Sequence, residues 1–396
     1  MAEASLVKDP VRESMNDAAN DSSAGARKRV GILGGGQLAM FLCESGRELG
    51  LSTTVLAHSD DSPAAFSADC LLQGPLSALD LIDQLANAVD VITYEVEDIP
   101  PETLARLASL HEQGIVEVHP HPQTLLTLQD KLEQKQWLVA NGLPTNIGRP
   151  FDEDTDPTAV GGWYGYPFVQ KARRGGYDGK GVQVIRSPDQ GQLWPVPSVI
   201  EPFLEGVREF AVVAVRRDDG EVDCYPPVEL EFDGQGNVLK RVVAPADISP
   251  HLSELANAIT RRAIRRLQGA GVFAVELFLL PGGEMLVNEI SPRVHNSGHH
   301  TMESCQASQF EQHMRVITSQ PAAPTVQNRP AVMVNLLSDG QMKAWPSLAT
   351  DRANVYCHWY GKREPRPLRK MGHLTALGSS IADARDQAEQ AEAAIT

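Results

Sequence analysis

The chain has 396 residues, of which 42% are hydrophobic and 22% are charged. This composition is typical of a soluble globular protein, and the length predicts two or three domains. The formal net charge of -16 argues against non-specific nucleic-acid binding, which requires a basic surface. No apolar run reaches the roughly 18 residues that mark a membrane span. We therefore expect neither a nucleic acid nor a membrane as a partner.

The cysteines indicate a reducing compartment. There are five, an odd number, widely spaced and without a Cys-x-x-Cys pair: Cys43, Cys70, Cys224, Cys305 and Cys357. This pattern predicts free thiols in a cytoplasmic protein and offers no zinc site. Residues 1–28 are polar and lack the apolar segment of a secretory signal, so we expect a disordered tail.

The first domain is predicted to be a doubly wound α/β unit. Arg29–Leu33 is a short apolar strand, a glycine-rich turn at Gly34–Gln37 follows, and then a helix begins. The turn fits a dinucleotide fingerprint, but the second strand runs into His58, where an NAD-binding fold places an acid, so NAD is disfavoured. A buried strand at 89–93 delivers Glu95 to the sheet edge where such folds bind ligands.

A glycine-rich segment lies between two predicted strands, at 166–170 and 182–185. It contains four glycines within residues 175–181, and its cations are Lys171, Arg173, Arg174 and Lys180. Glycines let backbone N–H groups approach a ligand and cations neutralise phosphate, so we expect a phosphate-binding flap. It is no Walker A loop, because no Gly-Lys-Ser/Thr leads into a helix. A charged surface hairpin is the alternative.

Two hairpins follow the flap. Residues 209–215 and 222–228 are predicted to pair around a turn at Asp218–Gly220. In the second hairpin, 272–280 and 285–290 pair around a four-residue turn, which puts Glu276 opposite Glu289. Like charges directly opposite destabilise a sheet, whereas a divalent cation with ATP phosphates uses such a pair. We expect an Mg²⁺ site, unless the register slips or both carboxylates reach solvent.

Two further clusters are typical of anion binding. Arg293, His295 and Asn296 come directly after the predicted metal hairpin, and arginine binds carboxylates bidentately, so a small oxyanion is expected there. Residues 358–375 form a basic run in an otherwise acidic chain. This run favours a phosphate pocket, with a solvated loop as the alternative.

Together these motifs resemble the ATP-grasp superfamily, and within it the 5-(carboxyamino)imidazole ribonucleotide synthetase family of purine biosynthesis. The matching motifs run from residue 29 to the end and include Gly34-Gly-Gly-Gln-Leu38, Tyr94-Glu-Val-Glu97, Gln129-Asp-Lys131, Arg173-Arg-Gly-Gly-Tyr-Asp-Gly-Lys-Gly181, Val287-Asn-Glu-Ile-Ser-Pro-Arg293, His295-Asn-Ser-Gly-His299 and Arg369-Lys-Met-Gly-His373. Leu368 departs from the pattern, because glycine is usual there.

The resemblance implies an α/β and α+β fold in four parts. These are the tail 1–28, an N-terminal doubly wound α/β domain at 29–122, a central ATP-grasp domain at 123–322 with a flap subdomain at about 145–205, and a small β-rich C-terminal domain at 323–396. It also implies an ATP- and Mg²⁺-dependent ligase that carboxylates 5-aminoimidazole ribonucleotide with bicarbonate through carboxyphosphate. We expect a cytoplasmic homodimer without a fused mutase domain.

The resemblance further implies roles for individual residues. Those expected to bind the ATP phosphates, or to cover them, are Lys131, Lys171, Gly176, Tyr177, Asp178, Gly179, Lys180, Gly181 and Val182. Those expected at the adenosine are Glu201, Pro202, Phe203, Leu204 and Glu209. Glu276 and Glu289 would ligate Mg²⁺, with Asn288 close by.

The remaining implied roles concern the two other substrates. Arg293, His295 and Asn296 would hold bicarbonate and then carboxyphosphate, and Lys180 would assist catalysis. The residues expected to contact 5-aminoimidazole ribonucleotide are Gln37, Glu95, Tyr177, Asp178, Lys362, Arg369 and Lys370, of which the last three would hold its 5′-phosphate. Asp178 is a candidate general base. A formate-using sibling ligase and a non-catalytic nucleotide-binding protein are the alternatives.

Overall fold

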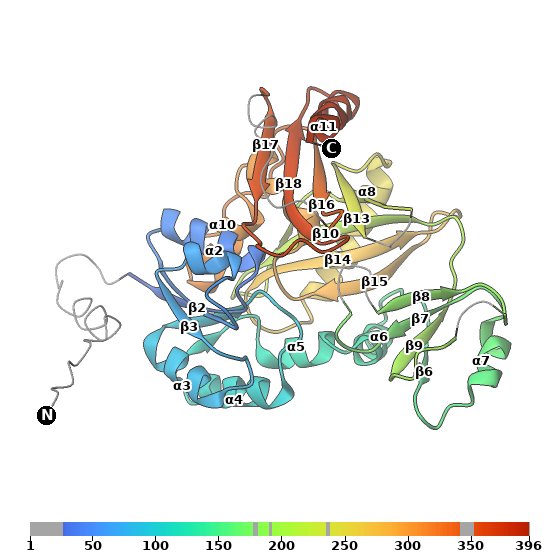
Figure 1. Cartoon of the computed structure of the whole chain (residues 1–396), viewed down its shortest axis with the longest axis horizontal. Helices are drawn as coiled ribbons and strands as arrows, with labels where there is room; N and C mark the ends of the chain where they lie inside the picture. Colours follow the sequence, from blue (N-terminus) through green and yellow to red (C-terminus); the bar gives the residue numbers. More distant parts are fainter. Residues whose placement is uncertain (1–26, 177–180, 190–191, 235–237, 341–351, 396) are drawn as a thin grey trace, which may run out of the picture.

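The computed structural model describes residues 27–176, 181–189, 192–234, 238–340 and 352–395. Three β-sheets organise these residues: one of five strands, one of nine and one of four (Figure 1). Within the described ranges, no helix is both long and apolar enough to cross a bilayer. Glycine-rich positions 177–180 of the predicted flap lie outside these ranges.

The five-stranded sheet is parallel, in the order β3-β2-β1-β4-β5, and confirms the predicted doubly wound unit. Its elements are β1 (Arg29–Leu33), α2 (Gln37–Glu48), β2 (Ser52–Ala57), a 3-10 helix (Pro63–Phe66), β3 (Cys70–Gln73), α3 (Leu79–Ala88), β4 (Val91–Tyr94), α4 (Pro101–Glu112) and β5 (Glu117–Val118). Apolar side chains cover both faces of β1 and β4, as expected for a parallel sheet between helices. Because β1 lies beside both β2 and β4, the turn at Gly34 and the end of β4 at Glu95 meet at one edge.

The four-stranded antiparallel sheet carries the predicted flap, in the order β6-β9-β7-β8. Its elements are β6 (Arg149–Phe151), α7 (Pro157–Tyr164), β7 (Phe168–Ala172), β8 (Val182–Ile185) and β9 (Ser198–Pro202). Lys171 of β7 pairs with Val182 of β8, so the glycine-rich segment connects two neighbouring strands, as predicted. In Figure 1 this sheet lies at the lower right, with α7 on its outer side.

The nine-stranded sheet follows the order β15-β14-β10-β12-β13-β16-β18-β17, with β11 beside β10. Its central-domain strands are β10 (Arg208–Arg216), β11 (Val222–Cys224), β12 (Val228–Phe232), β13 (Leu239–Ala244), β14 (Gly271–Leu279) and β15 (Met285–Ser291). The predicted return strand at 222–228 is present in its first half, where β11 pairs with β10 through Arg216 and Val222, but it ends at Cys224, because Tyr225-Pro-Pro227 separates β11 from β12 and proline has no N–H for the ladder.

The helices of the central part connect these sheets. They are α5 (Pro122–Leu128), α6 (Lys131–Ala140), α8 (Pro250–Ile264), a 3-10 helix (Asn296–Gly298), α9 (Thr301–Ser304) and α10 (Gln309–Ile317). Asp130 caps the start of α6 by accepting hydrogen bonds from the N–H groups of Leu132 and Glu133. The N-terminus of α6 is therefore fixed next to the flap, because the same carboxylate also binds Arg173 at 2.8 Å.

The C-terminal strands extend the same nine-stranded sheet. They are β16 (Ala331–Leu337), β17 (Val355–Trp359) and β18 (Lys370–Leu377), and they are covered by α11 (Ile381–Ile395) at the top of Figure 1. β16 pairs with β13 through registers such as Arg241 with Val334. Backbone hydrogen bonds therefore join the C-terminal residues directly to the central domain.

A buried histidine joins the two larger sheets. His313 of α10 accepts a hydrogen bond at Nδ1 from the Val272 N–H at 3.0 Å. Its Nε2 lies 2.7 Å from the Thr93 hydroxyl, and since Nδ1 is an acceptor, Nε2 carries the hydrogen and donates. Burial lowers the pKa of His313 to about 3, and burial lowers the pKa of His300 to about 3 as well.

We predict that acid destabilises the fold through these histidines. The unfolded chain takes up a proton at each near pH 6.5, whereas the folded protein does so only near pH 3, so stability falls as the pH drops between these values. At pH 5, each histidine should lower the free energy of unfolding by roughly 2 kcal/mol relative to pH 7. Urea unfolding across this pH range measures the slope.

A single substitution isolates the share of His313. His313→Gln keeps a hydrogen-bond acceptor and a donor but does not titrate. This variant should reduce the slope of stability against pH by the contribution of one histidine. An unchanged slope in the folded variant would show that His313 does not carry this dependence.

Candidate active site

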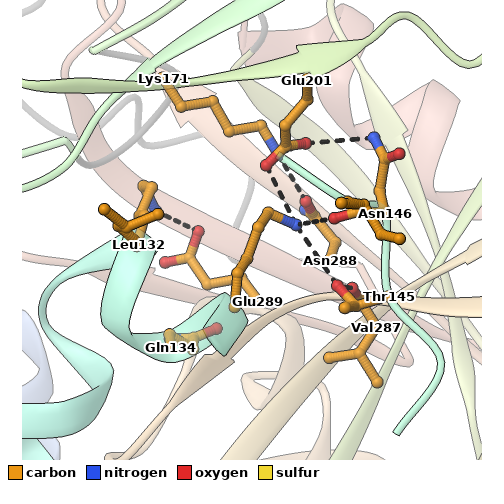
Figure 2. Close-up of polar contacts among 12 residues, drawn as sticks. Leu132, Gln134, Thr145, Asn146, Lys171, Glu201, Val287, Asn288 and Glu289 are labelled. Atoms are coloured by element: carbon orange, nitrogen blue, oxygen red, sulfur yellow. Dashed lines mark hydrogen bonds and ion pairs between the residues drawn. The ribbon is translucent and has the colours of Figure 1, made fainter. Parts of the chain in front are cut away.

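A buried carboxylate lies between the flap sheet and β15, among the polar contacts drawn in Figure 2. Glu201 of β9 is 1% exposed, and its two oxygens lie 3.0 Å from the ammonium groups of Lys171 and Lys135. The Asn146 amide donates a third contact at 3.3 Å. Burial opposes ionisation of Glu201 most strongly, yet Lys171 and Lys135 lower its pKa below the ordinary value. Glu201 is therefore a buried anion held between two cations.

The predicted carboxylate pair is present, and a register shift in the hairpin contributes to it. Glu276 of β14 lies opposite Glu289 of β15, and the register shifts directly after this pair. Lys131 contacts Glu289, and Asn288 donates to Glu276 at 3.2 Å. Burial and then the charges of Glu289 and Glu209 raise the pKa of Glu276 to about 7. Lys131 outweighs the effect of burial at Glu289, so its pKa is lowered.

This pair fits a hard divalent cation. The two carboxylates face each other, and their mutual repulsion helps to raise the pKa of Glu276, a repulsion that a bound cation would relieve. Oxygen donors suit Mg²⁺, which commonly keeps waters and substrate phosphates as its other ligands. The described part of the chain holds no group of three or more His, Cys, Asp or Glu side chains that could enclose a metal by itself.

The predicted oxyanion residues lie beside the carboxylate pair. The His295 imidazole Nε2 is 3.7 Å from Glu276, and the Arg293 guanidinium is 2.7 Å from Glu97, which follows β4. Gln309 holds the backbone of His295 from both sides, since it accepts from its N–H at 2.9 Å and donates to its carbonyl at 2.7 Å. The segment with Arg293, His295 and Asn296, called the oxyanion cradle from here on, therefore contacts both the hairpin with the predicted Mg²⁺ ligands and the N-terminal domain.

The glycine-rich turn of the N-terminal domain binds an internal carboxylate. The Gly36 N–H donates to Glu95 at 2.6 Å, at the start of α2 and next to Gln37. Burial raises the pKa of Glu95, although the Gly36 hydrogen bond and Arg293 oppose this. A Cβ on Gly34 would lie 2.5 Å from Glu95. The Glu95 carboxylate thus fills the glycine-rich turn, where dinucleotide-binding folds hold a pyrophosphate, and this adds to the sequence argument against NAD.

The C-terminal cations of the basic run gather where β18 begins. The Lys362 ammonium donates to the Lys370 carbonyl at 2.8 Å and lies 5.2 Å from the Tyr360 ring centre. Arg369 donates to the Glu364 carbonyl at 2.5 Å. Leu368 has a φ of 62°, a conformation that favours the glycine usual at this position. The structure thus joins Lys362 to the backbone of Lys370, whereas the Arg369 side chain contacts the backbone of Glu364.

The structure describes some of the predicted flap residues and not others. Gly176, Gly181 and Val182 lie at the two ends of the loop, and a Cβ on Gly181 would lie 3.0 Å from the Gly176 Cα. The predictions for Tyr177, Asp178, Gly179 and Lys180 fall outside the described residues. Pro202 ends β9 directly after Glu201, Phe203 and Leu204 lie in the connection that follows, and Glu209 lies at the start of β10.

Sequence reasoning missed several polar residues around these groups. They are Glu97, Lys135, Asn146, Gln309 and Asn335. Lys135 could have been found, because it is four residues after Lys131 and so shares its helix face. The others are single polar residues whose partners are distant in sequence.

Comparison with known proteins places this geometry in a family. Three family models match in order: a ribonucleotide synthetase preATP-grasp domain at residues 27–129, an ATP-grasp domain at 137–310, and a phosphoribosylaminoimidazole carboxylase C-terminal domain at 331–387. The N5-carboxyaminoimidazole ribonucleotide synthase of Synechococcus elongatus is 38% identical over 379 residues, which cover 92% of this chain and 93% of that protein. The chain belongs to the N5-carboxyaminoimidazole ribonucleotide synthase family.

Solved structures of family members agree with the fold. The N5-carboxyaminoimidazole ribonucleotide synthetase of Thermotoga maritima has a TM-score of 0.82 at 36% identity, covering 92% of this chain and 98% of that one. The Aspergillus clavatus synthase, solved with ADP and 5-aminoimidazole ribonucleotide, has a TM-score of 0.84 at 31% identity, covering 93% and 98%. The chain spans about two thirds of several fungal and plant phosphoribosylaminoimidazole carboxylases that it also matches.

We predict that Lys135→Met destabilises the protein by about 3 kcal/mol, because removing one partner leaves Glu201 a buried charge with a single cation. Urea unfolding measures the change. Lys28→Met is the matched control, since Lys28 forms a solvent-exposed pair with Glu117 at 3.8 Å, and its loss should cost less than about 1 kcal/mol. Equal losses in the two variants would contradict a stabilising role for the buried pair.

Proposed function

We propose that the protein carboxylates the exocyclic amine of 5-aminoimidazole ribonucleotide with bicarbonate and ATP. The products are 5-(carboxyamino)imidazole ribonucleotide, ADP and phosphate, as a step of de novo purine biosynthesis. The observation that carries the proposal is the continuity of the site. His295 contacts Glu276, a predicted Mg²⁺ ligand, and Arg293 contacts Glu97, which lies two residues after Glu95. The residues expected to bind the three substrates are therefore neighbours, and the substrates would meet there.

The nucleotide half of the site suits phosphoryl transfer. Lys131 and Lys171 would bind the ATP phosphates, which would replace the carboxylate and amide oxygens that these lysines now contact. Glu276 and Glu289 would hold Mg²⁺, whose charge offsets that of the transferring phosphoryl group. Glu201 to Leu204 would line the adenine, and Glu209, whose pKa is raised by burial, would accept from the ribose hydroxyls. Flap residues 176–182 would cover the phosphates.

Bicarbonate needs activation, because it is a poor electrophile. Its phosphorylation by ATP gives carboxyphosphate, a mixed anhydride. Arg293, His295 and Asn296 offer N–H donors for the anionic oxygens of both species. The rigid backbone of His295, held by Gln309, keeps these donors in place. A closed flap would exclude water from the intermediate.

The ribonucleotide half of the site accepts the activated carboxyl group. Gln37 and Glu95 would orient the aminoimidazole, together with Tyr177 and Asp178 of the flap. Lys362, Arg369 and Lys370 would hold its 5′-phosphate, which accounts for the basic run. The amine then attacks the carboxyl carbon, the bond from that carbon to the phosphate oxygen breaks, and inorganic phosphate leaves. Asp178 is the proposed general base that takes the proton of the amine, with Lys180 as an accompanying cation.

The setting of the enzyme is also a proposal. All five cysteines are free thiols, which supports a reducing cytoplasm. We propose a homodimer on the family resemblance, and sedimentation of the purified protein tests it. We also propose the domain division 29–122, 123–322 and 323–396 with a flap subdomain at about 145–205, which limited proteolysis tests.

We expect ADP release from Mg²⁺-ATP to require both bicarbonate and 5-aminoimidazole ribonucleotide. Glu289→Gln should reduce it at least roughly a thousandfold, because the metal loses a charged ligand. Glu284→Gln is the control, since Glu284 is an exposed glutamate in the turn of the same hairpin and should behave as the wild type. Turnover that ignores bicarbonate but needs formate would overturn the proposed function.

A glycine substitution tests the ribonucleotide pocket separately. Gly36 has φ −76° and ψ −168°, which alanine tolerates, but its Cβ would lie 2.7 Å from a Glu95 oxygen. Gly36→Ala should therefore displace Glu95 and raise the KM for the ribonucleotide about tenfold or more, with the KM for ATP unchanged. Gly162→Ala is the control, because its Cβ meets no atom within 4 Å. An unchanged KM for the ribonucleotide would exclude Glu95 from its binding.

A further inference from the structure

Two asparagine side chains bind each other beneath the oxyanion cradle. The Asn296 amide nitrogen donates to the Asn335 oxygen at 3.0 Å, and the Asn335 nitrogen donates to the Asn296 oxygen at 2.7 Å. Asn335 is completely buried on β16, and Asn296 is 9% exposed in the 3-10 helix. The two residues are 39 positions apart and belong to different parts of the fold. Each amide thus uses its oxygen and one N–H on the other.

A third contact fixes the direction of both amides. Asn335 also donates to the Leu239 carbonyl of β13 at 2.9 Å. Because a backbone carbonyl can only accept, the Asn335 NH₂ group must face Leu239, and its oxygen must face Asn296. The Asn296 amide is then oriented as well, with its oxygen bound by Asn335 and one N–H remaining. A flipped Asn296 would place two NH₂ groups against each other.

We propose that Asn335 is a positioning residue for the small oxyanion, which it controls through Asn296. This assignment rests on the proposed function, in which Asn296 holds bicarbonate and carboxyphosphate. The pairing with Asn335 directs the Asn296 oxygen toward Asn335 and leaves one Asn296 N–H to donate to the anion. An acceptor oxygen facing bicarbonate would repel it, whereas an N–H binds it.

The hydrogen bonds between Asn296 and Asn335 also make the C-terminal strands part of the proposed bicarbonate site. Asn335 lies opposite His373 of β18, and Lys370 at the start of β18 is one of the residues proposed to bind the 5′-phosphate. β13 supplies Leu239 and pairs with β16, so the position of Asn335 is set by two strands of the nine-stranded sheet. A buried polar side chain with all its groups bonded is rigid, because any other orientation leaves unpaired groups.

The test is steady-state kinetics on full-length Asn335→Leu, which keeps a similar side-chain volume but removes every hydrogen bond. We expect the KM for bicarbonate to rise at least about tenfold, while the KM values for ATP and for 5-aminoimidazole ribonucleotide stay within about twofold. Asn335→Ser, which keeps one hydroxyl donor, should show a smaller rise. If Asn335→Leu does not fold, Asn335→Ser, which is smaller and polar, is the variant on which the KM for bicarbonate is measured.

Val334→Ala is the matched control for a purely structural effect. Val334 is the preceding residue on β16, is equally buried, and packs on the opposite face in the C-terminal core. Its truncation should lower the melting temperature without a selective change in the KM for bicarbonate. A selective bicarbonate effect in Val334→Ala equal to that in the Asn335 variants would overturn the assignment.

A double-mutant comparison tests whether Asn335 acts through Asn296. In an Asn296→Ala background, Asn335→Ser should change the KM for bicarbonate no further, since the residue it positions is gone. Additive effects, or an unchanged KM for bicarbonate in folded single variants, would refute the positioning role. Failure of the proposed function is distinguishable, because it would appear as a wild-type protein whose ADP release ignores bicarbonate, and the assignment would then fall with it.

Discussion

The unequal distribution of buried charge is the constraint on which the site depends. Glu201 is matched by two lysines, so it stays ionised at 1% exposure. Among the described residues, Glu276 is contacted by the Asn288 amide and lies 3.7 Å from His295, and its pKa rises to about 7. A buried charge costs several kcal/mol unless it is paired. Two lysines around one carboxylate leave excess positive charge at Glu201, which suits phosphate, whereas the facing carboxylates of Glu276 and Glu289 suit a divalent cation.

The site is also where the three sheets are joined. Lys171 of the flap sheet bonds Asn288 of the nine-stranded sheet, and Arg293 of the same region contacts Glu97 at the edge of the parallel sheet. The buried His313 links α10 to Thr93. A shared apolar cluster that contains Ile32, Phe41, Val213 and Phe310 also joins the parallel sheet to the nine-stranded one. The geometry of the site therefore depends on how the sheets are placed, because a shift of one sheet would separate the residues predicted to bind nucleotide from those predicted to bind bicarbonate.

Most local predictions were confirmed because short-range chemistry decides them. Counting residues from the turn between β14 and β15 predicted the pairing of Glu276 with Glu289, but the ladder beside the turn pairs Leu277 with Val287, and the register shift between Leu277 and Glu276 is what brings the two glutamates opposite each other. The two strands that flank the glycine-rich loop were predicted from β-branched runs, and β8 has the predicted bounds. The return strand after Gly220 was predicted too long, because β11 pairs with β10 as expected but ends at Cys224, before the two prolines at 226–227. The glycines of the fingerprint at Gly34–Ala39 make room for Glu95, in agreement with the sequence argument against NAD.

The sequence by itself determined the order of the elements, the phosphate-binding cations, the carboxylate hairpin and, through their combination, the family. Periodicity, turn chemistry and motif spacing are local properties, so they can be recognised in the sequence without knowledge of the packing. Only the tertiary structure decided which residues brace these groups. Asn335 lies in an apolar strand and Gln309 at the start of a helix, and nothing in their local sequence indicates that one orients Asn296 and the other holds His295. The physical reason is that a neutral amide has no charge pattern or period, so its role depends on the partner that folding brings to it.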